Sequence, residues 1–322
     1  MGIGALMNAR MLLPAAAALV AAAPAAAAVT KPTVSTGGAA HITQTSATLT
    51  GRVNPNGART TYFFQYGTSR IYGATTGPTD AGSGTRAKVA TADISGLAAN
   101  TRYHYRLVAQ NSKGTTFGGD KTFTTKKQPL GFTLAANPNP ATFGAGTTLA
   151  GQLTGTGNAG RTVKLQQKAF PYTGAFSDLG NPLVTDAAGN FVFPVSLMTV
   201  NTQFRVTTIG GTPRATSGIV LVGCAVRVSL KVSHKRVRRG RKVRFSGHVT
   251  PANDGALFAI QRLKKGVWVT VKGGSLHHAS TSSSRYAKTM RIRHFGQYRI
   301  FVGVNNQNTS GTSATVRIRR RG

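Results

Sequence analysis

The chain has 322 residues, with 40 Lys and Arg, six Asp and no Glu, so its formal net charge at pH 7 is +34. Twenty-two of the 40 cations lie in the last hundred residues, beside a single acid, Asp254. Acid–base catalysis and the binding of hard cations such as Ca²⁺ usually need carboxyl groups close together, and these six are scattered along the chain. The composition therefore argues against an enzyme and for a binding or structural protein.

The residue types favour strands over helices. Gly is abundant at 39 residues, Thr, Val and Ser are frequent, and helix formers such as Gln are scarce. A hydrophobic content of 40% is enough to bury a core in each of several domains of about 100 residues. We predict an all-β fold of three tandem β-sandwiches, spanning residues 29–126, 127–223 and 224–322.

The first 28 residues have the pattern of a secretory signal peptide. Arg10 gives the start its positive charge, an apolar run follows over 11–23, and Ala26 and Ala28 supply the small side chains of a cleavage site before Val29. We expect cleavage there, no transmembrane segment in the mature chain, and a secreted or cell-envelope location. The lone cysteine, Cys224, excludes an intrachain disulfide and is expected at a domain junction.

The first domain shows strand-like alternation at short spacing, with turn residues between the strands. We expect strands over 45–53, 60–66, 87–97, 101–111 and 115–124. Residues 97–109 then resemble the E–F corner and F strand of fibronectin type III domains, through Leu97, Thr101 and Tyr103. That resemblance implies a β-sandwich in which the Tyr103 hydroxyl bonds back to the backbone, with Leu97 as a second structural residue.

The second and third domains share one frame of glycines and glutamines. The first set is spaced 7, 9 and 6 residues apart and the second 7, 8 and 6: Gly144, Gly151, Gly160 and Gln166, then Gly240, Gly247, Gly255 and Gln261. An aromatic residue follows 31 positions after the third glycine in both domains, Phe191 and Tyr286. The two domains are therefore predicted to be repeats. Both resemble bacterial immunoglobulin-like modules, and Trp268 occupies a frequent aromatic position.

Motifs for chemistry are weak. Residues 155–160 match the GxGxxG dinucleotide pattern, but a strand-like segment follows where that motif needs a helix, so we interpret them as a hairpin loop. No GxSxG elbow occurs, and the adjacent His277 and His278 would face opposite sides of a strand. We expect no cofactor, no metal site and no catalytic residue.

The last domain carries the signal with the clearest physical content. In the expected strands 227–232, 242–249 and 290–293 the apolar residues alternate inward, which turns the intervening cations outward. An immunoglobulin-like arrangement puts these strands in one sheet, so their cations would form one basic face rimmed by the turn 234–241. The candidate polyanion-binding residues are Arg227, Lys231, Lys235, Arg236, Arg238, Arg239, Arg241, Lys242, Arg244, Arg291 and Arg293.

Two interpretations of this face stay open. It could bind a polyanion, such as an anionic cell-wall or extracellular polymer, or it could be a solvated surface that discourages strand pairing. Sequence-specific nucleic-acid recognition is not expected, because Phe245, Tyr286 and Tyr298 are predicted to face inward.

We expect a non-catalytic protein for adhesion, spacing or attachment to matrix or wall, with strand addition at the first domain's edges as a route to protein partners. One alternative is an accessory carbohydrate-binding or spacer protein of an extracellular enzyme system, for which Tyr62, Tyr66 and Tyr72 would have to form an exposed row. Another is an enzyme with an unrecognised site, which an Asp–Asp or Asp–His cluster would indicate.

Overall fold

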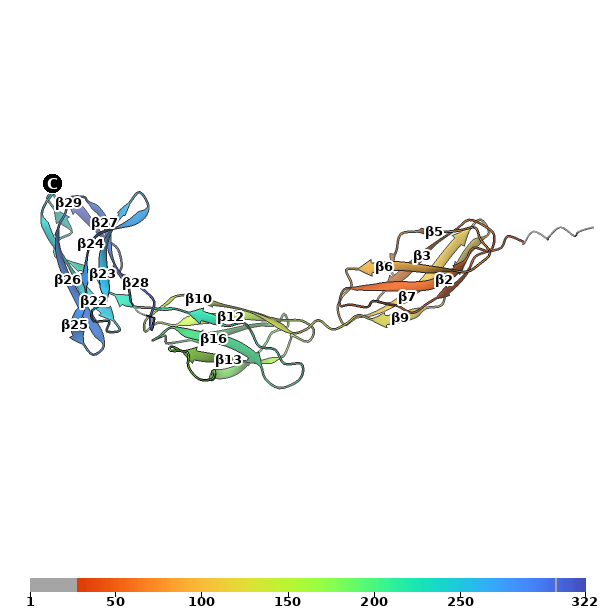
Figure 1. Ribbon diagram of the computed structural model, residues 1–322, viewed down its shortest axis with the longest axis horizontal. Coiled ribbons are helices and arrows are strands. Elements are labelled where there is room, and N and C mark those ends of the chain that lie inside the picture. Colours follow the sequence, from red (N-terminus) through yellow and green to blue (C-terminus); the bar gives the residue numbers. More distant parts are fainter. Residues whose placement is uncertain (1–27, 305) are drawn as a thin grey trace, which may run out of the picture. The chain divides into compact units, whose positions relative to one another are not determined.

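A computed structural model describes residues 28–304 and 306–322, and the predicted signal peptide falls outside them apart from its last residue. The described residues form strands and no helix, which confirms the all-β prediction. The chain divides into two compact units, Met1–Lys126 and Lys127–Gly322 (Figure 1). The predicted boundary at 126/127 coincides with this division, whereas the one at 223/224 lies inside the second unit.

The first unit is a two-layer sandwich. One sheet has the order β1-β2-β6, with bounds Thr33–Thr36, Ser46–Asn54 and Lys88–Ser95. The other has the order β4 (Ala74–Thr75), β3 (Thr60–Gly67), β7 (Arg102–Asn111) and β8 (Gly114–Phe117). In addition, β5 (Thr79–Gly82) pairs with β3, and β9 (Lys121–Thr124) pairs with β7. Leu49, Phe64, Tyr105 and Leu107 are fully buried between the sheets. Each such side chain contributes about 1.5–3 kcal/mol through its burial.

The expected strand 115–124 is wrong as a single element. It is two strands, β8 and β9, which pair with different stretches of β7. The break falls at Gly118, whose N–H donates to the Leu107 carbonyl at 2.8 Å. A Cβ atom at Gly118 would lie 2.4 Å from the Thr36 Oγ1, so a larger residue here would have to displace the Thr36 side chain.

The second unit contains two hydrophobic cores, one in the middle sandwich and one in the last. The middle sandwich has sheets β10-β12-β15 (Gly131–Asn137, Thr147–Thr154, Asn190–Val195) and β14-β13-β16-β17 (Ser177–Val184, Thr162–Ala169, Thr202–Thr208, Val220–Val222). Residues 155–160 connect β12 in one sheet to β13 in the other. The hairpin interpretation is therefore wrong, because the two flanking strands do not pair.

The last sandwich has a five-stranded and a six-stranded sheet. The first has the order β19 (Arg227–Val228), β22 (Lys242–Thr250), β26 (Ser283–Arg291) and β25 (His277–Ser280), and β20 (Lys231–Val232) also pairs with β22. The second has the order β21 (Arg236–Val237), β29 (Val316–Arg320), β27 (Gly296–Val302), β23 (Leu257–Lys264) and β24 (Val267–Ser275), and β28 (Gly311–Thr312) also pairs with β27.

The predicted repeat is visible at a paired glycine and aromatic residue. Gly151 lies opposite Phe191, and Gly247 lies opposite Tyr286. A Cβ atom at either glycine would lie 2.1 Å from a backbone oxygen of the neighbouring strand, that of Thr133 or of Ser229. The same Cβ position would lie 2.8 Å from the Phe191 ring or 2.7 Å from the Tyr286 hydroxyl, so both the backbone and the opposite aromatic side chain require glycine at this place in both sandwiches.

Hydrogen bonds join the middle and last sandwiches. The Asn201 side chain accepts from the Cys224 N–H at 2.7 Å and from the Thr309 hydroxyl at 3.0 Å, and it donates to the Asn306 carbonyl at 2.9 Å. The short strands β11 (Ala141–Thr142) and β18 (Cys224–Ala225) pair in parallel at this junction. Cys224 is fully buried there, and burial raises the pKa of its thiol. The segment between the two cores is thus strand rather than a loose linker.

Candidate functional site: the basic surface of the last sandwich

The five-stranded sheet presents basic side chains on its outer face. Along β22, Val243, Phe245 and Val249 are buried, while Lys242, Arg244 and His248 are exposed. The period of two between strand residues causes this separation.

Cross-strand register then brings cations from neighbouring strands together. Lys242 lies opposite Arg291, and Arg285 lies between His248 and His277 in one row across three strands. Like charges in such pairs are destabilising unless salt or a bound anion compensates them. Lys231 and Arg244 line a hollow of about 760 Å³ with this row. Arg285 was not among the predicted site residues, although the inward-facing Tyr286 beside it already indicated its outward position.

Lys235 and Arg236 were expected in the turn 234–241 at the rim of this face; instead, Arg236 begins strand β21 of the other sheet. The Ser233 N–H donates to the backbone carbonyl of Arg244 on the five-stranded sheet. Two residues later, the backbone carbonyl of Lys235 accepts from the Arg319 N–H of the other sheet. The chain therefore changes sheets between these residues, and Arg236 pairs with Arg319 on β29. Proximity in sequence to strand β22 does not reveal such a crossing.

Arg227 is exposed, as the alternation predicted, but its side chain also makes a contact outside the last sandwich. One of its Nη atoms donates to the carbonyl oxygen of Phe143 in the middle sandwich at 2.9 Å. This hydrogen bond holds the exposed Arg227 side chain at the junction between the middle and last sandwiches.

A second concentration of cations lies at the end of the last sandwich that carries the β21–β22 turn. This turn is held against the segment after β26 by backbone hydrogen bonds, from Gly240 N–H to Ile292 and from Ile292 N–H to Arg241. The Arg239 Nε also donates to the Arg293 carbonyl at 3.2 Å. These bonds fix the backbone from which Arg238, Arg239, Arg241 and Arg293 project.

Three hollows of about 610, 540 and 810 Å³ adjoin one another at this end, and each shares residues with the others. The first two share Lys242 and Arg291, whereas Arg238 and Arg239 are common to the second and third. We call their basic lining the basic end; its members are Arg238, Arg239, Arg241, Lys242, Arg262, Lys272, Arg291, Arg293, Arg320 and Arg321, with His234 and His294.

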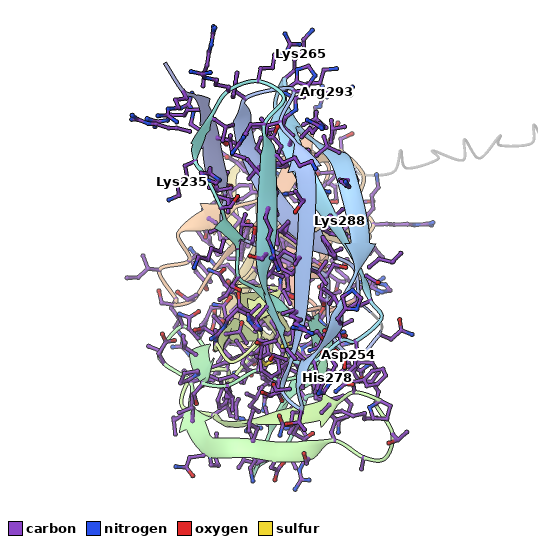
Figure 2. The ribbon with its side chains drawn as sticks, turned by 90° about the vertical axis from the view of Figure 1, so that its left-hand side faces the viewer. Lys235, Asp254, Lys265, His278, Lys288 and Arg293 are labelled. Carbon is purple, nitrogen blue, oxygen red and sulfur yellow. The ribbon has the colours of Figure 1, made fainter. Side chains whose placement is uncertain are left out.

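No Asp side chain lines the three hollows of the basic end. Among the described residues after 223, the one ion pair joins His278 to Asp254, and no Lys or Arg side chain there lies within 4.0 Å of a carboxylate oxygen. Figure 2 shows Lys265 and Arg293 at one end of the last sandwich and Asp254 with His278 towards the other. The sequence showed the excess of cations, but only the fold places the single acid away from them.

Asp254, His278 and Ser284 come together, but in the wrong order for acyl transfer. The Ser284 hydroxyl donates to one oxygen of Asp254, and the other oxygen lies 2.9 Å from the His278 Nδ1. A nucleophilic serine must bond to the histidine, not to the carboxylate. The hydrogen bonds from Ser284 and then His278 lower the pKa of Asp254, and Ser284 is fully buried. This group stabilises the turn before β23.

The first sandwich contains a second Asp–His pair. The His104 Nδ1 lies 2.9 Å from Asp120, whose carboxylate also accepts from the Tyr72 hydroxyl at 3.0 Å and faces the Arg70 Nε at 3.4 Å. Partial burial raises the pKa of Asp120, but the bonds from His104 and Tyr72 and the charges of His104 and Arg70 outweigh it and leave the pKa lowered. The carboxylate is thus occupied by its own neighbours.

No two Asp residues share a partner among the described hydrogen bonds and ion pairs, and no group of three His, Cys or Asp side chains there could hold a metal ion. The described part of the chain likewise has no helix long and apolar enough to cross a membrane.

The three tyrosines named for a sugar-binding row do not form one. Tyr62 is buried in the core, with 7% of its surface exposed. Tyr72 is half-buried, and the Arg106 guanidinium covers its ring at 4.7 Å from the centroid. Tyr66 is half-buried against the core. A stacking platform needs adjacent exposed rings, which this arrangement does not supply.

One arrangement recurs in all three sandwiches. A glutamine on one strand accepts from the Nε of an arginine on the next, in the pairs Gln65–Arg106, Gln166–Arg205 and Gln261–Arg299, at 2.7–2.9 Å. The guanidinium of each arginine also lies over an aromatic ring, that of Phe117, Phe176 or Trp268. Trp268 therefore packs on the outer face of its sheet, while Tyr103 and Leu97 are buried at the E–F corner, where the Tyr103 hydroxyl accepts from the Ala98 N–H.

No family model and no curated protein matches the chain. Among solved structures, the FN1-FN3 domains of chicken CNTN1 align over 89% of this chain and 99% of that one, with 16% identity and a TM-score of 0.30. A tetra-tandem repeat from the extending region of a large adhesion protein aligns over 89% of this chain and 74% of that one, with 11% identity and a TM-score of 0.29. A titin I-band fragment aligns over 92% of this chain and all of that one, at 11% identity and a TM-score of 0.29. The strand pairing of the chain itself shows consecutive β-sandwiches.

Proposed function

We propose that this protein is an exported, non-catalytic tandem of β-sandwiches whose last sandwich attaches it to an anionic polymer of the cell envelope or surrounding matrix. The observation that supports this most is the uncompensated charge of the last sandwich: 22 Lys and Arg against one Asp, with that Asp bonded to Ser284 and His278. The signal-like first 28 residues support export. The first and middle sandwiches act as spacers in this proposal.

The electrostatic mechanism is physically sufficient. Each cation that neutralises a charge on a polyanion releases condensed counterions, so affinity is high in dilute salt and falls steeply as salt rises. A surface with one sign of charge also speeds encounter with an oppositely charged chain. The outer face and the basic end adjoin at Lys242 and Arg291, so a flexible polymer has a continuous path of cations to follow.

Binding of the full chain to immobilised polyphosphate, heparin and poly-glutamate tests this directly. We expect affinity for at least one polymer to fall by about a thousandfold between about 50 mM and about 500 mM salt. A variant with Arg239, Arg244, Arg285 and Arg293 replaced by Ser should bind about a hundredfold more weakly in low salt, with a shallower salt dependence.

A matched variant replaces four exposed cations of the first sandwich, Arg52, Arg86, Lys88 and Arg102, by Ser. It loses the same net charge, and we expect less than about a twofold change because these positions lie outside the last sandwich. Equal losses in the two variants, or binding that is independent of salt, would contradict the proposal.

A further inference from the structure

A cleft lies between the two layers of the last sandwich at its basic end, beside the edge formed by β24 and β26. It is the hollow of about 610 Å³, with Val271, Met290 and Tyr298 as its apolar wall and Arg262, Arg291 and Arg293 among its cations. The Lys272 Nζ bridges the two strands by donating to the Thr289 carbonyl at 3.0 Å. We call this hollow the interlayer cleft.

Arg262 is placed unusually for a cation. Along β23, Phe258 and Ile260 are buried between the layers, and Arg262 is the next residue in the same inward series. Its cross-strand neighbour Tyr298 is 1% exposed, and the charge of Arg262 acts against the rise that burial causes in the Tyr298 pKa. Arg262 is half-buried, and within the described residues its side chain has no carboxylate or hydrogen-bond partner.

The equivalent positions of the other two sandwiches are uncharged. The recurring glutamine aligns the strands, so the residue after it is Tyr66 in the first sandwich, Gln167 in the middle one and Arg262 in the last. All three residues are half-buried. The fold therefore does not need a cation here, and a partly desolvated cation without a counter-ion has an energetic cost.

We propose that the interlayer cleft is the seat of one oxyanion group of the polymer, bound by Arg262 from within and by Arg291 and Arg293 at the rim. This inference rests on the proposed function and locates its strongest contact. The guanidinium fork matches the geometry of phosphate and carboxylate, and partial burial strengthens a charge-assisted bond relative to one made on the open sheet face. The class of ligand is a phosphate, sulfate or carboxylate group with room beside it for an apolar part.

The test compares two variants that lose the same charge, Arg262→Gln in the cleft and Arg317→Gln on β29, where the exposed Arg317 lies outside both the outer face and the basic end. Calorimetric titration of the full chain uses tripolyphosphate, a heparin tetrasaccharide and tetra-glutamate as three separate probes, which identify the oxyanion. We expect roughly tenfold weaker binding of the preferred probe for Arg262→Gln and less than about twofold for Arg317→Gln. Arg262→Lys should be intermediate, because it keeps the charge and loses the fork.

Folding is checked on the same samples. Removal of an unpaired, half-buried cation should leave the melting temperature of Arg262→Gln without ligand unchanged or higher. Equal losses of affinity in Arg262→Gln and Arg317→Gln, or oligomer binding that does not depend on Arg262, would overturn the cleft as the binding site of the oxyanion while polymer binding stands. Failure of the wild-type chain to bind any of the three polymers would overturn the proposed function as well.

Discussion

The first and last sandwiches share a frame but treat charge in opposite ways. Both have the glutamine–arginine–aromatic arrangement and a buried tyrosine whose hydroxyl donates to a backbone carbonyl, Tyr105 to Gly37 and Tyr286 to Ser229. The first sandwich gives Arg59 and Arg70 carboxylate partners in Asp80 and Asp120. The last sandwich has no such partner for any Lys or Arg in its described residues. The shared frame occurs both with and without such ion pairs, so its stability depends on packing rather than on paired charges.

The largest expected loss of stability comes from removing the buried tyrosine of either sandwich, which tests whether both depend equally on packing. Tyr105→Ala and Tyr286→Ala each remove a fully buried ring and its hydroxyl bond, so each should lower the free energy of unfolding of its own sandwich by about 3–5 kcal/mol. Calorimetry of the full chain measures the loss, and amide hydrogen exchange shows which sandwich has lost protection.

The matched variants Tyr105→Phe and Tyr286→Phe keep the ring and lose only the hydroxyl bond, at a cost of about 1 kcal/mol each. A loss for Tyr286→Ala that is far smaller than for Tyr105→Ala would show that the two frames are not equivalent.

A smaller effect is expected at the carboxylate that distinguishes the first sandwich. Asp120→Asn weakens the bonds to His104 and Tyr72, so the first sandwich should lose about 1 kcal/mol at neutral pH. The pKa of Asp120 lies below its usual value of 3.8, so its contribution is complete above that pH and disappears as the pH falls through the folded-state pKa. The acid unfolding profile of the variant should therefore be flatter below about pH 4 than that of the wild type.

The control for that measurement is Asp93→Asn. Asp93 is exposed, and its carboxylate has one hydrogen-bonding partner, the Thr48 hydroxyl. Both variants remove one negative charge, so an identical acid profile for the two would mean that net charge, and not the Asp120 cluster, sets the acid sensitivity.

The smallest effect concerns the arrangement common to the sandwiches. Gln65→Ala and Gln261→Ala each remove one bond to a partly exposed guanidinium, and we expect a loss of about 0.5 kcal/mol in both. The exposed Gln110 and Gln297 provide controls, Gln110→Ala and Gln297→Ala, with no expected change. A difference between the first and last sandwiches would show that Arg299 depends on Gln261 more than Arg106 depends on Gln65.

The predicted elements show where sequence reasoning stops. Alternation in β22 gave the outward positions of Lys242 and Arg244, because side chains in a strand alternate by geometry alone. Lys235 and Arg236 were instead expected in a turn, because nothing in the local sequence shows that the chain changes sheets just before them and forms β21 beside β29. Arg262 was not predicted either. A cation that follows buried residues in an inward series usually marks the end of a strand, and only the packing of the two layers shows that this edge is open.

The amino-acid sequence by itself determined the all-β fold, the repeat of the last two sandwiches and the concentration of cations after residue 223, because these follow from residue types and their periods. Only the tertiary structure decided that Arg227 would serve the junction, that Asp254 would lie away from the basic end, and that Arg262 would enter a cleft. Those outcomes depend on which strands pair and which edges stay open, and pairing between strands far apart in the chain is decided by packing and register.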